Sequence, residues 1–168
     1  MRSSTVWHEE ALCKAHPRDA FDCGNDALNT FLRRYARQSH ERDTAKTYVA
    51  VDDESGAVMG FYTLTLASLD AAQMPPEHAK RYGFHAVPLF VLARLAVDKR
   101  FQGRGLGGQL LVAAAHRCLN VAEQVGGVGL LIDAKDGRAA AWYRSFGATP
   151  LSDAPLRLFL PLAVFQTK

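Results

Sequence analysis

The amino-acid sequence predicts an α+β fold with one mixed β-sheet and helices packed on both of its faces. Two β-rich segments joined by a turn precede a long helical segment, and single steps from helix to strand follow it. Such an order gives a sheet whose strands run partly antiparallel and partly parallel. The length of 168 residues fits one compact domain. We therefore expect a single domain over residues 1–168.

The first half of the chain predicts three strands and one helix. Asn25 is a residue type that caps helices, and it precedes an apolar set at helical spacing. That set is Ala27, Leu28, Phe31, Leu32 and Tyr35. Alternation predicts strands over residues 6–11, 46–52 and 57–66, the last two joined by a turn. Residues 70–83 contain two consecutive prolines, which favours a loop with at most a short helix.

The second half predicts three strands and two helices. Residues 89–97 form an apolar strand, and an apolar-striped helix follows over residues 105–125. A strand over residues 128–134 comes next, and then a helix over residues 137–146 with Gly147 as its C-terminal cap. The last strand covers residues 156–164. Pro161 interrupts it, which favours two pieces or a strand at an edge of the sheet.

Composition favours an ordinary globular protein and excludes several classes. Hydrophobic residues make up 48% of the chain and charged residues 22%, and the formal net charge is only +3. The three cysteines form no disulfide framework, which favours the reducing cytoplasm. The N-terminal segment has no signal-peptide pattern, and no apolar run is long enough to span a membrane. The six histidines are dispersed, so we expect no metal.

The most informative stretch is a glycine-dense turn that opens the long helix. It reads Gln102-Gly103-Arg104-Gly105-Leu106-Gly107. The first turn of a helix has N–H groups that lack helical partners and a positive dipole end, so it can hold an anion. Glycines let a phosphate approach the backbone, and we expect Arg100 and Arg104 to add positive charge. The spacing differs from the Rossmann pattern Gly-x-Gly-x-x-Gly. A pyrophosphate is the expected ligand.

This turn resembles the acyl-CoA signature of the GNAT N-acetyltransferase superfamily, Gln/Arg-x-x-Gly-x-Gly/Ala. Gln102, Gly105 and Gly107 occupy its marked positions, and the predicted order of elements is similar over nearly the whole chain. The resemblance implies a GNAT-type fold with acetyl-CoA as cosubstrate. It also implies that the amides of the turn hold the CoA pyrophosphate and that the preceding strand pairs with the pantetheine arm. The residues concerned are Leu95, Ala96, Val97, Gln102, Gly103, Arg104, Gly105, Leu106, Gly107 and Gly108.

A second GNAT-like stretch covers residues 133–148 and ends in Tyr143-Arg144-Ser145-Phe146-Gly147-Ala148. The resemblance places Tyr143 near the CoA sulfur as the catalytic residue that protonates the leaving thiolate. A thiol has a pKa of about 8.5 and a tyrosine about 10, so this transfer is only mildly uphill. The alternative for Tyr143 is a core aromatic beside Trp142 and Phe146.

Two further patterns, residues 21–32 and 88–98, resemble the GNAT toxins of bacterial toxin–antitoxin pairs. The resemblance implies acetylation of the α-amino group of aminoacyl-tRNA, which halts translation. It also implies a ribbon-helix-helix antitoxin as partner. A second copy of the chain is a further implied partner, because family members often dimerise. No membrane partner is expected. The alternatives are a GNAT enzyme for a small amine or peptide, and a non-catalytic CoA-binding module.

Clustered basic residues are the candidates for contacts with tRNA phosphates. They are Arg33, Arg34, Arg37, Lys46, Arg81, Arg94 and Arg138. For the residues on the predicted first helix, the alternative is a solvated helix face. Arg94 differs because it is the one charge in an apolar strand, where a charge must be paired or functional. It either bridges to an acidic group or faces the acceptor.

Overall fold

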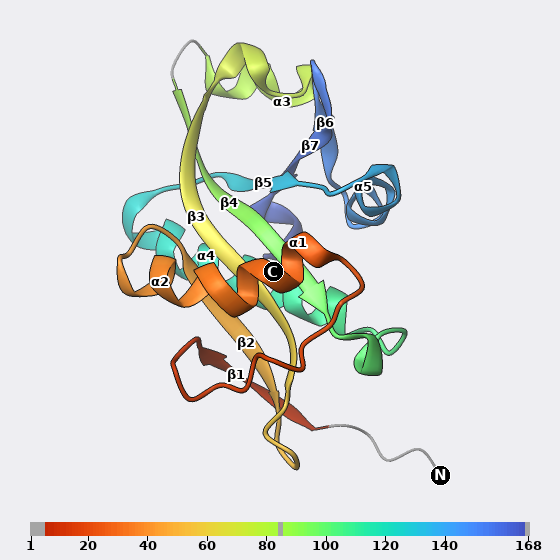
Figure 1. The fold of residues 1–168 in the computed structure, drawn as a ribbon. Coiled ribbons are helices and arrows are strands. Elements are labelled where there is room, and N and C mark those ends of the chain that lie inside the picture. Colours follow the sequence, from red (N-terminus) through yellow and green to blue (C-terminus); the bar gives the residue numbers. More distant parts are fainter. Residues whose placement is uncertain (1–5, 84–85, 167–168) are drawn as a thin grey trace. The chain divides into compact units, whose positions relative to one another are not determined.

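The computed structural model describes residues 6–83 and 86–166 (Figure 1). His85, one of the six histidines, and the first five residues of the N-terminal segment lie outside the described residues. The chain forms two compact units. The first consists of Met1–Leu64 and Arg94–Val112, and the second of Thr65–Ala93 and Ala113–Lys168. The single domain over residues 1–168 stays a prediction.

The sheet is mixed, as the sequence predicts. Its seven strands follow the order β1-β2-β3-β4-β5-β7-β6. The strands are β1 (Trp7–Ala11), β2 (Lys46–Asp52), β3 (Val58–Asp70), β4 (Ala86–Val97), β5 (Gly129–Asp133), β6 (Thr149–Leu151) and β7 (Ala154–Pro161). Strand β4 is parallel to β5, whereas β1–β2, β2–β3, β5–β7 and β6–β7 are antiparallel pairs.

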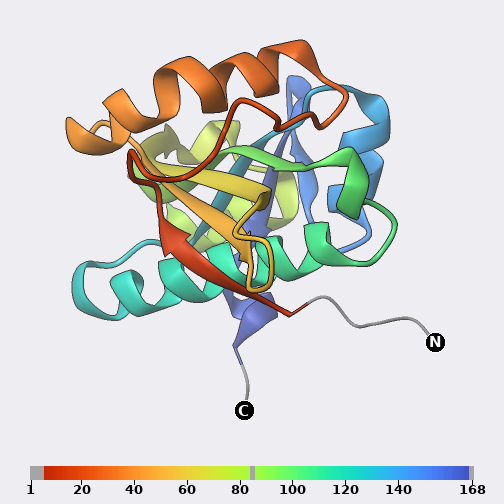
Figure 2. The same cartoon turned by 60° about the horizontal axis from the view of Figure 1, so that its bottom comes forward.

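The first unit packs helical segments on opposite faces of its strands. Phe61 of β3 belongs to an apolar core with Phe31 and Leu32 of the first helical segment. The neighbouring Gly60 points to the other face, where a Cβ would lie 2.9 Å from a methyl group of Leu110 in α4 (Leu106–Val125). Successive strand residues face opposite sides of a sheet, and Figure 2 shows the two helical segments on either side of the strands. The predicted two-faced packing is therefore present within this unit.

The first helical segment is interrupted by a π-helical turn. It consists of α1 (Asp26–Thr30), the π-turn Phe31–Tyr35, and α2 (Ala36–Glu41). Asn25 caps α1 as predicted, because its side chain accepts a hydrogen bond from the Leu28 amide at 3.0 Å.

The π-turn corrects the predicted apolar face. A π-turn contains one more residue than an α-turn, so it rotates all the side chains that follow it. Tyr35, predicted on the buried face, is 53% exposed, and Ala36 is buried in its place. Ala27, also predicted on the buried face, is exposed too, although it precedes the π-turn.

The second unit has its own apolar core, which includes Leu89 and Val91 of β4, Leu131 of β5 and Phe159 of β7. Its helices are α3 (Pro76–Tyr82), α5 (Gly137–Arg144) and the part of α4 from Ala113 onward. The seven-residue α3 agrees with the short helix allowed in the predicted loop.

Two details of the second unit differ from the sequence prediction. The sequence did not predict β6, which lies at an edge of the sheet, whereas β7 lies between β5 and β6. Pro161 ends β7, and a 3₁₀ turn over Leu162–Phe165 follows, so the predicted last strand is shorter.

Candidate functional site

The glycine turn joins the end of β4 to the start of α4, and two of its glycines have a left-handed backbone. Gly103 has a φ of 78° and Gly105 a φ of 83°, a region that residues with a Cβ rarely adopt. The Gly105 carbonyl accepts a hydrogen bond from the Gln109 amide at 3.2 Å, which begins the helix. A Cβ at either glycine would meet no atom within 4 Å. Backbone conformation rather than packing therefore requires these glycines, and the space beside them is open.

The start of α4 is anchored by close packing on the sheet. Leu106, a predicted cofactor residue, has a buried side chain, so only its backbone N–H is suited to an anion. Beneath it lies Gly60 of β3, where a Cβ would come within 2.8 Å of the Ala96 carbonyl. The sequence analysis did not identify Gly60. A glycine inside a predicted strand was the available signal.

The side chains of Gln102 and Arg100 donate hydrogen bonds to other groups of the protein. The Gln102 side chain donates from Nε2 to the Cys23 carbonyl at 3.1 Å and to the Val97 carbonyl at 2.8 Å. Arg100 donates from Nε and Nη2 to the Asp98 carboxylate at 3.0 and 3.2 Å. Arg100 thus pairs with Asp98, and its contribution to phosphate binding stays a prediction.

Asp98 is a buried acceptor, 1% exposed, that the sequence analysis did not identify. Burial opposes ionisation of its carboxyl group. Hydrogen bonds from Arg100 and from the Asp22 amide outweigh this effect and hold its pKa below the ordinary value.

The pattern over residues 21–32, which we call the N-terminal motif, lies directly against the glycine turn. The Asp22 amide donates to Asp98 at 3.1 Å, and the Lys99 amide donates to the Asp22 carbonyl at 2.8 Å. The Asp22 carboxylate accepts hydrogen bonds from the Gly24 amide at 2.9 Å and from Asn29 at 3.0 Å. These bonds, the Gly24 one first, hold the pKa of Asp22 below its usual value. The structure thus brings together two stretches that the sequence analysis identified separately.

Tyr143 lies on α5 in the second unit. Asp136 caps this helix, and its carboxylate accepts from the Ala139 amide at 2.8 Å. Tyr143 is 7% exposed and makes an edge contact with Trp142, with ring centroids 5.0 Å apart. Burial raises the pKa of Tyr143 well above that of a free tyrosine. The phenol is therefore a weaker acid than a free tyrosine, so proton transfer to a thiolate is more uphill than the sequence suggested.

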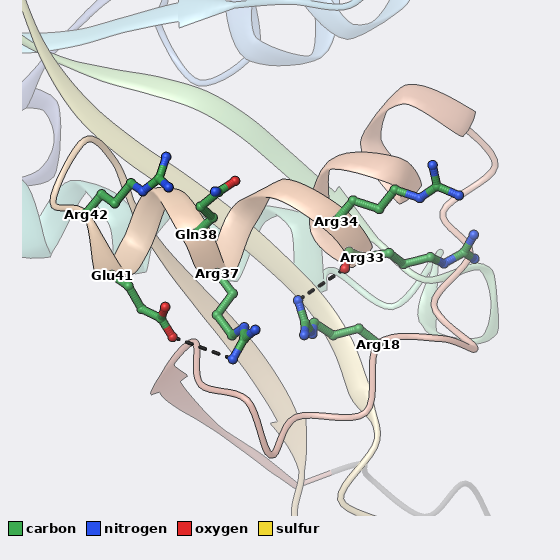
Figure 3. Close-up of a pocket in the computed structure, with 7 residues that line it drawn as sticks. All are labelled: Arg18, Arg33, Arg34, Arg37, Gln38, Glu41 and Arg42. Atoms are coloured by element: carbon green, nitrogen blue, oxygen red, sulfur yellow. Dashed lines mark hydrogen bonds and ion pairs between the residues drawn. The ribbon is translucent and has the colours of Figure 1, made fainter.

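The first helical segment carries an arginine-lined pocket of about 430 Å³. We call it the arginine pocket. Its lining residues are Arg18, Arg33, Arg34, Arg37, Gln38, Glu41 and Arg42. Figure 3 shows Arg18 reaching from the loop before α1 toward the helices that carry the others. Five positive side chains face one negative one, so the pocket suits an anionic ligand.

The internal contacts of the arginine pocket hold some of its members in place. Arg18 donates from Nη1 to the Leu32 carbonyl at 3.1 Å, and Arg33 donates to the Phe21 carbonyl. Arg37 and Glu41 form an ion pair at 3.7 Å. Sequence analysis predicted Arg33, Arg34 and Arg37 together and did not predict Arg18.

The remaining predicted RNA contacts are dispersed. Lys46 pairs with the Asp43 carboxylate at 2.5 Å. The Arg94 guanidinium lies 3.7 Å from the centroid of the Phe31 ring, a cation–π contact that neither sequence interpretation anticipated. Arg81 on α3 and Arg138 on α5 are exposed and belong to the second unit.

The structure also bears on metals, thiols and membranes. Within residues 6–83 and 86–166, no group of three or more His, Cys, Asp or Glu side chains is arranged to hold a metal ion. Cys23 and Cys118 are buried, and Cys13 is exposed. Among the described helices, none is both long and apolar enough to span a membrane.

Comparison with known proteins identifies the family. Residues 43–147 match the model of the acetyltransferase (GNAT) domain. The chain is 31% identical over 160 residues to a probable toxin TacT of Sinorhizobium fredii, covering 90% of this chain and 88% of the relative. It is 36% identical over 141 residues to a tRNA-acetylating toxin of Mycobacterium tuberculosis, covering 84% and 83%.

Solved structures agree over most of the chain. AtaT complexed with acetyl-methionyl-tRNAfMet has a TM-score of 0.87 at 28% identity, covering 94% of this chain and 96% of AtaT. A Tyr→Phe mutant of AtaT bound to the C-terminus of the antitoxin AtaR and acetyl-CoA has a TM-score of 0.81 at 26% identity, covering 95% of both chains. The predicted GNAT fold is confirmed, and the chain belongs to the GNAT acetyltransferase family.

Proposed function

We propose that this chain is a toxin that transfers the acetyl group of acetyl-CoA to the α-amino group of aminoacyl-tRNA and so blocks translation. The observation that carries the acceptor is the arginine pocket, which lies in the same unit as the glycine turn. An RNA backbone is a polyanion that such a pocket suits. The relative named a tRNA-acetylating toxin and the AtaT structure with acetyl-methionyl-tRNAfMet support the same acceptor, and the relative named a probable toxin TacT supports the toxin.

The cosubstrate site is the glycine turn with the end of β4. Amides at the N-terminus of α4 would hold the CoA pyrophosphate, aided by the positive end of the helix dipole. The backbone of β4 would pair with the pantetheine arm in the manner of an added strand. Gln102 already uses the Val97 carbonyl, so the pairing would draw on the other backbone groups of Leu95, Ala96 and Val97. The proposed contacts are Leu95, Ala96, Val97, Gly103, Arg104, Gly105, Leu106, Gly107 and Gly108, with Gln102 supporting the turn.

The chemistry needs no strong general base. An α-amino group has a pKa of about 7.7–8.0, so a useful fraction is neutral near pH 7. Backbone N–H groups near Leu95 would stabilise the oxyanion that forms when the amine attacks the thioester. Tyr143 would then donate its phenolic proton to the departing sulfur.

Phosphates of the tRNA would contact Arg33, Arg34 and Arg37 of the arginine pocket. Lys46, Arg81, Arg94 and Arg138 are further candidates. The partners we propose beside tRNA are a ribbon-helix-helix antitoxin and a second copy of the chain. This activity would operate in the cytoplasm, where aminoacyl-tRNA is used.

Two assays with purified protein test this function. Labelled acetyl-CoA should transfer its acetyl group to charged tRNA and leave uncharged tRNA unlabelled, and cell-free translation should stop when both protein and acetyl-CoA are present. Undiminished translation together with rapid acetylation of a free small amine would replace the toxin by a small-amine acetyltransferase. Absence of turnover on every amine, with CoA still bound, would leave a binding module.

A further inference from the structure

The Gln102 side chain is directed at protein carbonyls. An amide group has two donor hydrogens on its nitrogen, and Nε2 of Gln102 lies within hydrogen-bond distance of two acceptors. These are the carbonyls of Cys23 and Val97, at 3.1 and 2.8 Å. The residue that opens the glycine turn therefore ties that turn to β4 and to the N-terminal motif.

Two more hydrogen bonds attach the N-terminal motif to the stretch of chain that ends at Gln102. The Asp22 amide donates to the buried Asp98 carboxylate, and the Lys99 amide donates to the Asp22 carbonyl. The N-terminal motif thus has three hydrogen bonds to the stretch from Asp98 to Gln102, of which the Gln102 bond is nearest to the glycines.

The other end of the motif reaches the arginine pocket. The Phe21 carbonyl accepts a hydrogen bond from the Arg33 guanidinium. Asn29 of α1 bonds both the Asp22 carboxylate and the Cys23 amide, at 3.0 and 2.9 Å. A continuous series of hydrogen bonds therefore runs from the glycine turn through the segment Phe21–Asn25 to one wall of the pocket.

We propose that Gln102 is a positioning residue that couples the two anion sites. Filling the glycine turn with CoA restricts the loop that holds Gln102, so its bond to Cys23 breaks less often and the segment Phe21–Asn25 opens less often. Through Phe21, this stabilises the position of Arg33. The inference relies on the proposed function for the identity of the ligand, and the bonds themselves do not depend on it.

Amide hydrogen exchange at residues 22–24 tests the coupling with CoA itself as the probe. In the parent protein, saturating CoA should slow exchange of these amides about tenfold, since a stabilised hydrogen bond of ordinary strength changes local opening by that factor. Gln102→Met keeps the length of the side chain and removes both donor hydrogens. In that variant, measured at a CoA concentration that calorimetry shows to saturate it, the slowing should fall below about twofold.

Two further variants make the result specific. Gln109→Met is the matched control, since Gln109 lies on α4 shortly after the glycine turn and accepts a hydrogen bond from the Trp7 indole at 3.0 Å. It should behave like the parent. Gln102→Arg restores long-reaching N–H donors and should restore the slowing, even if the methionine variant is poorly folded.

The outcomes separate this inference from the proposed function. Equal slowing in the parent and in Gln102→Met overturns the coupling, as does a parent that binds CoA without any slowing. A parent that binds no CoA overturns both the cosubstrate and the coupling. A parent that shows the slowing but does not acetylate aminoacyl-tRNA refutes the acceptor and leaves the coupling standing.

Discussion

At the scale of single residues, Tyr143 carries the largest predicted effect on activity. Replacing it with phenylalanine removes the phenolic proton and keeps the ring that packs against Trp142. We expect kcat to fall about 100-fold to 10,000-fold, the usual contribution of a general acid, with an unchanged melting temperature. Acetyl transfer at saturating substrate measures it. A variant as fast as the parent would show that Tyr143 is only a core aromatic.

The two cysteines Cys13 and Cys118 should differ in reactivity. Burial raises the pKa of the Cys118 thiol to about 12, so almost no thiolate forms at pH 8, whereas Cys13 is exposed. Iodoacetamide at pH 8 should modify Cys13 and leave Cys118 unmodified until the protein is denatured, as mass spectrometry can show.

The same shift has a consequence for stability. Because the folded-state pKa of Cys118 lies above the ordinary value, its contribution is complete below about pH 8.5 and is lost as the pH rises toward 12. The Cys118 thiol thus contributes to unfolding in alkali rather than in acid.

At the scale of elements, the glycine turn separates conformational from steric demands. Gly105→Ala places a Cβ on a residue with a φ of 83° but in open space. We expect a loss of about 1–2 kcal/mol in the free energy of unfolding, the cost of a left-handed backbone, and weaker CoA binding. Denaturant melts and calorimetry measure both.

Gly137→Ala is the control for Gly105→Ala. Gly137 opens α5, also has open space at its Cβ position, and lacks a positive φ. This change should leave stability unchanged or slightly raised, because alanine is the better helix former. Equal losses at both sites would mean that backbone conformation is not what requires Gly105.

Elements whose pattern lies within a short stretch of sequence were predictable. The bounds of β2 and the Asn25 cap agree with the prediction because alternation and capping depend on neighbouring residues. The three-residue β6 is too short to show alternation. The π-turn shifts a helical period by one residue, which an α-helical count cannot reveal.

In the candidate site, too, features formed by neighbouring residues were predictable and features formed by distant residues were not. The glycine turn was evident because its residues are consecutive. The N-terminal partners of Gln102 and Asp98, Cys23 and Asp22, lie 79 and 76 positions away along the chain, so no local period connects them. Arg18 lines the arginine pocket from a loop, so no helical period connects it with Arg33, Arg34 and Arg37. Sequence pattern thus identified the turn but not the side chains that hold it.

At the scale of the whole molecule, the residues proposed for function belong to both compact units. The glycine turn and the arginine pocket belong to the first, and Tyr143 belongs to the second. The net charge of +3 is small for a protein that binds RNA, so local concentration of arginines must supply the attraction.

RNA affinity should therefore depend on salt, and the arginine pocket should set that dependence. Each phosphate contact adds about 0.7–0.9 to the slope of log affinity against log salt. Arg34→Ala should reduce the slope by roughly one contact and weaken binding. Arg157→Ala is the control, because Arg157 pairs with Asp133 at 3.1 Å in the second unit. Equal slopes in the parent and in Arg34→Ala would exclude Arg34 from the interface.

The π-turn at Phe31–Tyr35 has a consequence for insertions and deletions. It is equivalent to one extra residue inserted into a continuous α-helix. Deleting a single residue there would restore ordinary helical hydrogen bonding and leave Arg37 and Arg42 in place, because the π-turn already absorbs the extra residue. A homologue that is one codon shorter at this turn can therefore keep its helix, its core and the arginine pocket.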